Sequence, residues 1–329
     1  MRSSRFAREL RDATRPRSVA DLAAEGVTRS MLRGPAWRRT TYGYYAPALA
    51  AAASTAQRIL DATPLVPGTG ALTGWAALFV HGCDVFDGTD GRTGRPEPLP
   101  ILLGRDVGRR SVPGILLRRD QLSERERTWA YGLPLTTPLR ATFDAVRDAP
   151  SCTEAVVRLD AAGPALRADL DQLRIYCVQH SGWRGIRQVE AALALADLGV
   201  RSTWETRLRI FYQVDLGLPR PLVNPPVFGL DGSFLGMVDL LDPEAGLALE
   251  FDGQDHRQRG QHRRDNLREE GLEQANLTVA RVDSLDLQHH RPELARRLRS
   301  RRAQGMRRDR TQDRWTLTEP DWWRLRHAS

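Results

Sequence analysis

The chain has 329 residues, of which 41% are hydrophobic and 27% are charged. This balance is typical of globular proteins and excludes wholesale disorder, while the length exceeds what one hydrophobic core usually supports, so we expect several domains. The formal net charge of +8 favours a polyanionic partner.

The sequence contains no membrane or secretion signal. No segment reaches the roughly 18 consecutive apolar residues of a membrane span, and the basic N-terminus lacks the apolar core of a signal peptide. Three widely spaced cysteines form neither a disulfide framework nor a zinc motif. We therefore expect a cytoplasmic protein without a membrane partner.

All 49 basic side chains are arginine, because the sequence contains no lysine. Genomic base composition is the simplest cause of this bias. Its chemical consequence is that every cationic side chain is a planar, permanently charged group suited to phosphate, and none can act as a catalytic amine. A mechanism that depends on lysine is excluded.

The first region, residues 1–60, is predicted to be a winged helix-turn-helix. A helix capped by Ser18 should end at Gly26, a second short helix should follow Thr28, and residues 37–46 are aromatic and β-prone. Its nucleic-acid-binding residues would be four arginines on the second helix and the wing, namely Arg29, Arg33, Arg38 and Arg39. A small helical hairpin with solvated arginines is the alternative.

Residues 61–198 are predicted to be a mainly helical α/β scaffold. A buried helix is expected within residues 71–84, strands at 99–104 and 114–119, a helix after Thr137, and further helices downstream. The region contains no glycine-rich phosphate loop, close His/Cys cluster or nucleophile elbow. We assign it no catalytic role.

Residues 199–302 form the third predicted region. A helix should begin after Ser202, with Glu205 completing a capping box. Two strands follow, joined by the Asp231–Gly232 hairpin signal. Downstream we expect one strand on each side of an arginine-rich helix, and then a second basic helix. The remaining residues, 303–329, are expected to be a flexible basic tail, with docking back through Trp322 and Trp323 as the alternative.

Three carboxylates lie on apolar segments of this third region: Asp239, Glu250 and Asp252. Burying a charge is costly unless it is paired or coordinates a metal. Alternate side chains of a strand share a face, so Glu250 and Asp252 should point the same way. Three carboxylates at a sheet edge suit Mg²⁺ (or Mn²⁺), which commonly serves phosphate chemistry. The alternative is a set of solvated or turn-forming carboxylates.

The order of these motifs resembles a known family. Residues 201–287 resemble the Vsr-like (very-short-patch-repair type) branch of the PD-(D/E)XK endonucleases, through Glu205, Asp239, the segment EFDGQDH from Glu250 to His256, Asp265, Arg268 and Arg281. Residues 1–60 are similar to the winged-helix domain of AbiEi-type antitoxins, through ADLAAEGVTRSMLRG, WRR and GYYA. The resemblance implies an α/β fold whose C-terminal mixed sheet is flanked by helices, with a metal at Asp239 and Glu250, assisted by Glu205.

The sequence departs from the superfamily at the lysine position, which is filled by Asp252. His256 then becomes the candidate to activate water or protonate the leaving oxygen, because an ordinary histidine pKa of about 6.5 suits proton transfer at neutral pH. Arg264 and Arg268 on the charged helix are expected to contact phosphate. An ion pair between Asp265 and Arg268 is the alternative for Arg268.

Together these features predict a metal-dependent endonuclease whose partner is nucleic acid, with double-stranded DNA preferred. The carboxylate spacing leaves RNA open as a substrate, because phosphodiester chemistry is the same in both. The alternative is a catalytically inactive, DNA-binding transcriptional regulator or antitoxin-like protein that uses a nuclease-like fold.

Overall fold

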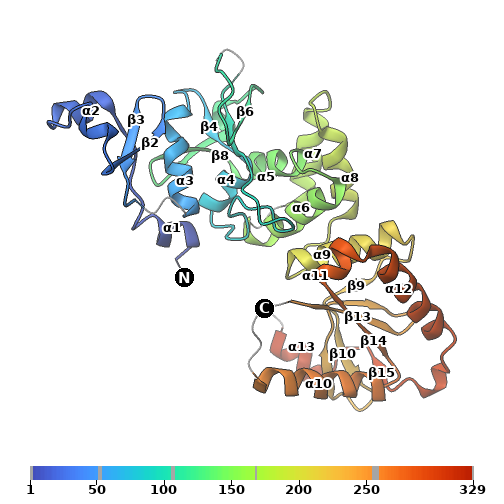
Figure 1. The fold of residues 1–329 in the computed structure, drawn as a ribbon. Helices are drawn as coiled ribbons and strands as arrows, with labels where there is room; N and C mark the ends of the chain where they lie inside the picture. Colours follow the sequence, from blue (N-terminus) through green and yellow to red (C-terminus); the bar gives the residue numbers. More distant parts are fainter. Residues whose placement is uncertain (1–2, 51–53, 105–107, 167–168, 254–258, 328–329) are drawn as a thin grey trace. The chain divides into compact units, whose positions relative to one another are not determined.

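The computed structural model describes residues 3–50, 54–104, 108–166, 169–253 and 259–327. Its contacts divide the chain into two compact units, Met1–Ala194 (unit 1) and Leu195–Ser329 (unit 2), and each is described by itself. Both units mix helices with small sheets (Figure 1). Among the described helices, none has both the length and the apolar character needed to cross a bilayer.

Unit 1 begins with a small three-stranded sheet in the order β1-β3-β2. Ser18 caps α2 by accepting a hydrogen bond from the Asp21 amide, as predicted. After Thr28 the chain forms only a three-residue 3₁₀ helix, because extended Gly34 and the following proline stop a longer one. The elements are α1 (Arg5–Glu9), β1 (Arg17–Ser18), α2 (Val19–Ala24), η1 (Met31–Arg33), β2 (Trp37–Thr41) and β3 (Tyr44–Pro47).

The rest of unit 1 is a five-stranded mixed sheet, in the order β6-β5-β4-β8-β7, packed against helices. Two of its strands, β5 and β6, were predicted, and β7 and β8 were not; β4, with two residues, is too short for a periodic signal. The strands are β4 (Ala71–Leu72), β5 (Leu99–Leu102), β6 (Ile115–Arg118), β7 (Arg127–Ala130) and β8 (Leu133–Thr136). The helices are α3 (Thr55–Ala62), α4 (Gly74–Val80), α5 (Pro138–Arg147), α6 (Cys152–Leu166), α7 (Leu170–Gln179) and α8 (Ile186–Leu195).

A buried polar network ties α5 to its neighbours in unit 1. Arg140 is fully buried and donates to Asp144 at 3.0 Å and to Glu126 at 2.9 Å. Thr73 also donates to Asp144, at 2.5 Å, and the Tyr176 hydroxyl donates to Glu126. Breaking one partner of a buried ion pair is strongly destabilising, so these polar residues have a structural role.

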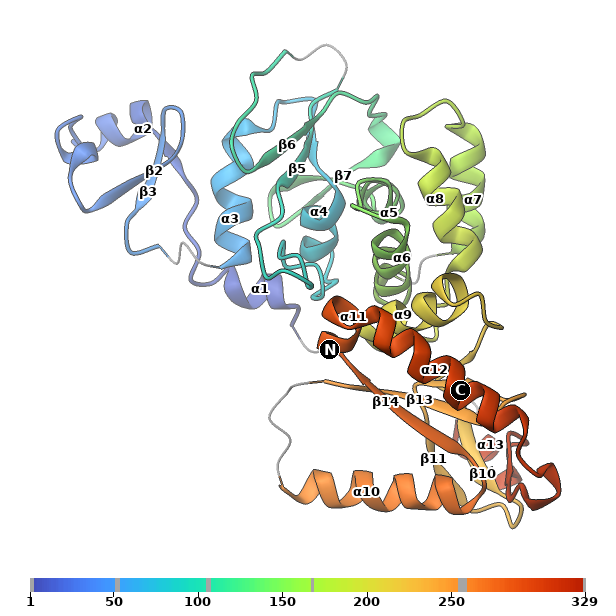
Figure 2. The ribbon, with the colours of Figure 1, turned by 45° about the vertical axis from the view of Figure 1, so that its right-hand side comes forward.

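The main sheet of unit 2 has the order β14-β13-β12-β9, with β13 and β14 parallel and the other pairs antiparallel. Helix α10 connects the two parallel strands on one face, and α9, α11 and α12 cover the other (Figure 2). The strands are β9 (Leu222–Val223), β12 (Leu240–Asp242), β13 (Leu247–Asp252) and β14 (Thr278–Asp283). The helices are α9 (Thr203–Ile210), α10 (Arg259–Gln274), α11 (Ser284–His289) and α12 (Arg291–Met306).

The first half of β13 is buried on both faces, its second half is partly buried, and its alternation follows the prediction. Leu247 and Leu249 pack with α9, α11 and α12, whereas Ala248 packs with the α10 side. By alternation Glu250 and Asp252 belong to the face of Ala248.

A second sheet of unit 2, in the order β11-β10-β15, contains the predicted hairpin with its turn at Asp231–Gly232. Its strands are β10 (Pro226–Gly229), β11 (Phe234–Met237) and β15 (Trp315–Thr316). Residues 233–241, expected to form one continuous strand after the turn, are broken into β11 and β12, which belong to different sheets. Asp239 lies in the break.

Residues 303–327, expected to be part of a flexible basic tail, form regular elements that pack on unit 2. Helix α12 runs past residue 302, β15 pairs with β10, and α13 (Asp321–His327) follows. The Trp323 ring lies 5.2 Å from Phe228 and 4.9 Å from Phe234, between centroids. Burial of aromatic surface explains why this charged segment is ordered.

Candidate active site

Asp239 and Glu250 are brought together by the pairing of β12 with β13. Leu240 lies opposite Leu249, so the residues just outward, Asp239 and Glu250, are neighbours across the two strands. The Phe251 amide donates to Asp239 Oδ2 at 2.7 Å, which fixes the orientation of that carboxylate. The predicted acid pair is therefore formed at one end of the sheet.

Burial raises the pKa of Glu250 to about 7; the positive charge of Arg268 opposes this rise and the negative charge of Asp239 adds to it. Burial also raises the pKa of Asp239, against the Phe251 hydrogen bond, and the charge of Glu205 adds to the rise. Such shifts mark a concentration of negative charge removed from water. They are also typical of functional sites.

Glu205 reaches this acid pair from the first turn of α9. Ser202 caps the helix by accepting from the Glu205 amide at 3.1 Å, as predicted. The Glu205 carboxylate instead accepts from the Arg201 amide and from Asn224 Nδ2, each at 2.9 Å. Only half of the expected capping box is thus present, and the carboxylate is held where its charge acts on Asp239.

Arg268 on α10 binds the acid pair directly. Its Nη2 donates to Glu250 Oε2 and its Nη1 donates to the Met237 carbonyl, both at 2.7 Å. Gly236 leaves room for the arginine stem, because a Cβ there would lie 3.0 Å from Arg268 Cγ and Cδ. The structure pairs Arg268 with Glu250. The sequence predicted a phosphate contact for Arg268, with an ion pair to Asp265 as the alternative, and did not predict this partner.

Of the other predicted catalytic residues, Asp252 does not join this group. Asp252 is paired in register with Asp283 on β14. In the parts of the chain that the structure describes, no group of three or more His, Cys, Asp or Glu side chains could hold a metal, so the expected trio of Asp239, Glu250 and Asp252 is not formed. His256 and the side chain of Arg264 lie outside the described residues.

The acid pair nevertheless fits a hard divalent cation. Glu250 Oε1 is buried and has no hydrogen-bond partner among the described residues, which leaves a costly orphan acceptor. Mg²⁺ is commonly held by one or two carboxylates and completes its shell with water and substrate phosphate. Asp239 and Glu250 would be the two carboxylates.

The four predicted arginines of residues 1–60 differ in their surroundings. Arg29 and Arg33 are exposed, and the exposed Arg39 guanidinium lies 5.3 Å from the Tyr42 ring centroid. Arg38 instead makes a two-point ion pair with Asp61 on α3, at 2.6 and 3.2 Å. Arg38 is thus engaged within its own unit, by a pair that no local sequence signal indicates.

Comparisons of the chain with protein-family models, with curated proteins and with solved structures found no match. The resemblance to Vsr-like endonucleases and to AbiEi-type antitoxins therefore stays a prediction. The functional argument rests on the geometry of the site.

Proposed function

We propose that the protein hydrolyses phosphodiester bonds of nucleic acid, preferably duplex DNA, with Mg²⁺ or Mn²⁺ held by Asp239 and Glu250. One observation carries the proposal: two neighbouring carboxylates have raised pKa values, and one of them keeps a buried oxygen without a hydrogen-bond partner. A divalent cation, when bound, would polarise the phosphate and lower the pKa of the attacking water.

The residues around the pair have defined roles in this proposal. The Phe251 amide orients Asp239, and Glu205 adds negative charge that favours cation binding. Arg268 holds one Glu250 oxygen and brings a positive charge to the place where a phosphate would approach. A guanidinium stays protonated at neutral pH, so Arg268 can stabilise charge but cannot serve as the base. His256 remains the proposed proton carrier.

The order of elements supports the same proposal. Helix α9 is followed by antiparallel strands, a crossover helix and a parallel strand, with the acid pair at one end of the sheet. This is the arrangement expected of a restriction-endonuclease-like core. The exposed Arg29, Arg33 and Arg39, with the net charge of +8, favour a nucleic-acid partner and predict strongly salt-dependent affinity.

The test is a cleavage panel with the full chain. Supercoiled plasmid, linear duplex and single-stranded RNA would be incubated with Mg²⁺, Mn²⁺ or EDTA. We expect metal-dependent cleavage of duplex DNA that is lost in Glu250→Gln. Cleavage that persists in this variant would place the reaction elsewhere, and cleavage of RNA alone would overturn the substrate class.

The Arg268–Glu250 ion pair also favours a second candidate, a DNA-binding regulator without turnover. In this candidate Arg268 neutralises the Glu250 carboxylate, which a divalent cation would otherwise need as a ligand. Salt-sensitive duplex binding by the wild-type chain, without cleavage under any metal condition, would support this candidate over the enzyme.

A further inference from the structure

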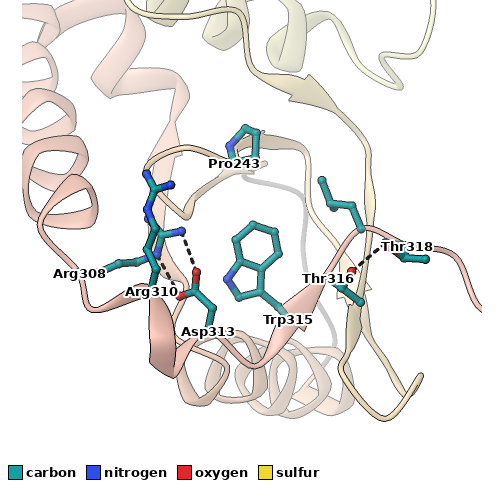
Figure 3. A pocket seen from close by; sticks show the side chains of 8 residues that line it. Pro243, Arg308, Arg310, Asp313, Trp315, Thr316 and Thr318 are labelled. Atoms are coloured by element: carbon teal, nitrogen blue, oxygen red, sulfur yellow. Dashed lines mark hydrogen bonds and ion pairs between the residues drawn. The ribbon is translucent and has the colours of Figure 1, made fainter.

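Unit 2 contains a pocket at the other end of its main sheet. Asp239 precedes β12 and Pro243 follows it, so the pocket wall and the acid pair lie at opposite ends of one strand. The pocket has a volume of about 540 Å³, and most of its lining comes from residues 308–318, which follow α12 (Figure 3). It is lined by Pro243, Arg308, Arg310, Asp313, Trp315, Thr316, Leu317 and Thr318.

Trp315 provides an aromatic surface in this pocket. It is partly buried and packs against the apolar cluster that includes Val227 and Leu241. Figure 3 shows the indole face-on at the centre of the pocket, with Pro243 on one side and Thr316 and Thr318 on another. An aromatic face held in this way is a suitable platform for a planar ring, because every nucleobase can stack on it.

The two arginines of the pocket are not equivalent. Arg308 is engaged by Asp313 through two contacts, at 3.0 and 3.1 Å, so its charge is neutralised. Arg310 is exposed, and its side chain makes one hydrogen bond, to the Glu244 carbonyl at 2.9 Å; no carboxylate among the described residues pairs with it. Arg310 therefore offers a positive charge and further N–H donors to an anion.

Thr316 adds a neutral donor beside the indole. Its Oγ1 accepts from the Thr318 amide at 3.0 Å, and its hydroxyl hydrogen has no acceptor among the described residues. A hydroxyl and a guanidinium on either side of an aromatic face match a ligand that has both a ring and a phosphate. The volume is also in the usual range for small-molecule sites.

We propose that this pocket binds a nucleoside monophosphate unit, with the base stacked on Trp315, the phosphate held by Arg310, and the Thr316 hydroxyl bonded to the base or sugar on the other side of the indole. The unit could come from a free nucleotide or from an unpaired nucleotide in a strand. None of these residues belongs to the acid pair, so binding needs neither metal nor cleavage.

The test is calorimetric titration of the full chain with 5′-AMP, adenosine and inorganic phosphate. We expect 5′-AMP to bind at least tenfold more tightly than either half of the molecule. In Arg310→Gln the affinity should fall about tenfold. It should remain unchanged in Arg296→Gln, which removes another exposed arginine, on α12 and outside the pocket lining. Trp315→Phe, which reduces the stacking surface but keeps an aromatic ring, should weaken 5′-AMP more than phosphate.

Four results would overturn the proposal: no binding of 5′-AMP at millimolar concentration, phosphate binding as tight as 5′-AMP, an equal loss in both arginine variants, or a 5′-AMP affinity that Trp315→Phe leaves unchanged. A single-stranded tetrathymidylate separates the two sources, because tighter binding than 5′-AMP supports a strand and weaker binding supports a free nucleotide. Unchanged 5′-AMP binding in Asp239→Asn would show that this site stands even if the proposed cleavage fails.

Discussion

Glu250→Gln should change how stability depends on pH. The pKa of Glu250 is about 7 in the fold, against an ordinary value of 4.5. Because the folded-state pKa is the higher one, the folded chain holds this proton more tightly than the unfolded chain. The stabilisation is complete below about pH 4.5 and is lost as the pH rises through about 7. One pKa unit corresponds to about 1.4 kcal/mol, so the loss between pH 5 and pH 8 is roughly 2 to 3 kcal/mol.

Glutamine cannot titrate, but it keeps an oxygen acceptor for Arg268. The free energy of unfolding would be measured for both proteins by urea denaturation at pH 5, 6, 7 and 8, followed by circular dichroism. We expect the wild type to lose about 2 to 3 kcal/mol more than the variant across this range. Glu293→Gln, at an exposed glutamate of α12, should follow the wild type. Parallel pH profiles for wild type and Glu250→Gln would refute the reasoning.

Three further predictions test separate contacts. Arg268→Gln should lower the free energy of unfolding by about 1 to 3 kcal/mol, measured by urea denaturation. It should also raise the pKa of its partner Glu250, measured by NMR titration. An unchanged Glu250 pKa would contradict the ion pair. Trp323→Ala should cost about 2 to 3 kcal/mol and expose the C-terminus to protease, whereas Leu325→Ala, at an 82% exposed side chain, should cost little. Arg33→Gln should weaken duplex binding and reduce its salt dependence, measured by fluorescence anisotropy. Arg38→Gln should mainly lower the free energy of unfolding, by up to about 1 kcal/mol. A larger loss of duplex affinity in Arg38→Gln than in Arg33→Gln would contradict these assignments.

Local sequence signals located the elements that hold the candidate site. The Ser202 cap, the Asp231–Gly232 turn and the alternation along β13 were all predicted and are confirmed. Each depends on residues a few positions apart, so the sequence contains the whole signal. Asp239 and Glu250 lie close together because β12 and β13 pair antiparallel, as in a hairpin.

Contacts between distant segments could not be predicted in the same way. Arg268 contacts Glu250 only because α10 packs on the face of the sheet that carries Glu250. Arg38 lies on β2, and its partner Asp61 lies on helix α3. The sequence did not indicate where Trp323 would dock, because nothing in the charged tail points to its partners on β10 and β11. In each case the partner is specified by the fold and not by the spacing along the chain.

The most direct test of the proposed function is the nicking rate of supercoiled plasmid in Mg²⁺ for wild type, Asp239→Asn and Glu293→Gln. Both variants lose one negative charge, but only the first lies in the acid pair. We expect wild type and Glu293→Gln to nick the plasmid in Mg²⁺ and not in EDTA. In Asp239→Asn the nicking rate should fall at least about 100-fold, as is typical when a charge-stabilising group is removed. Equal rates in Asp239→Asn and wild type, or nicking that persists in EDTA, would contradict the account.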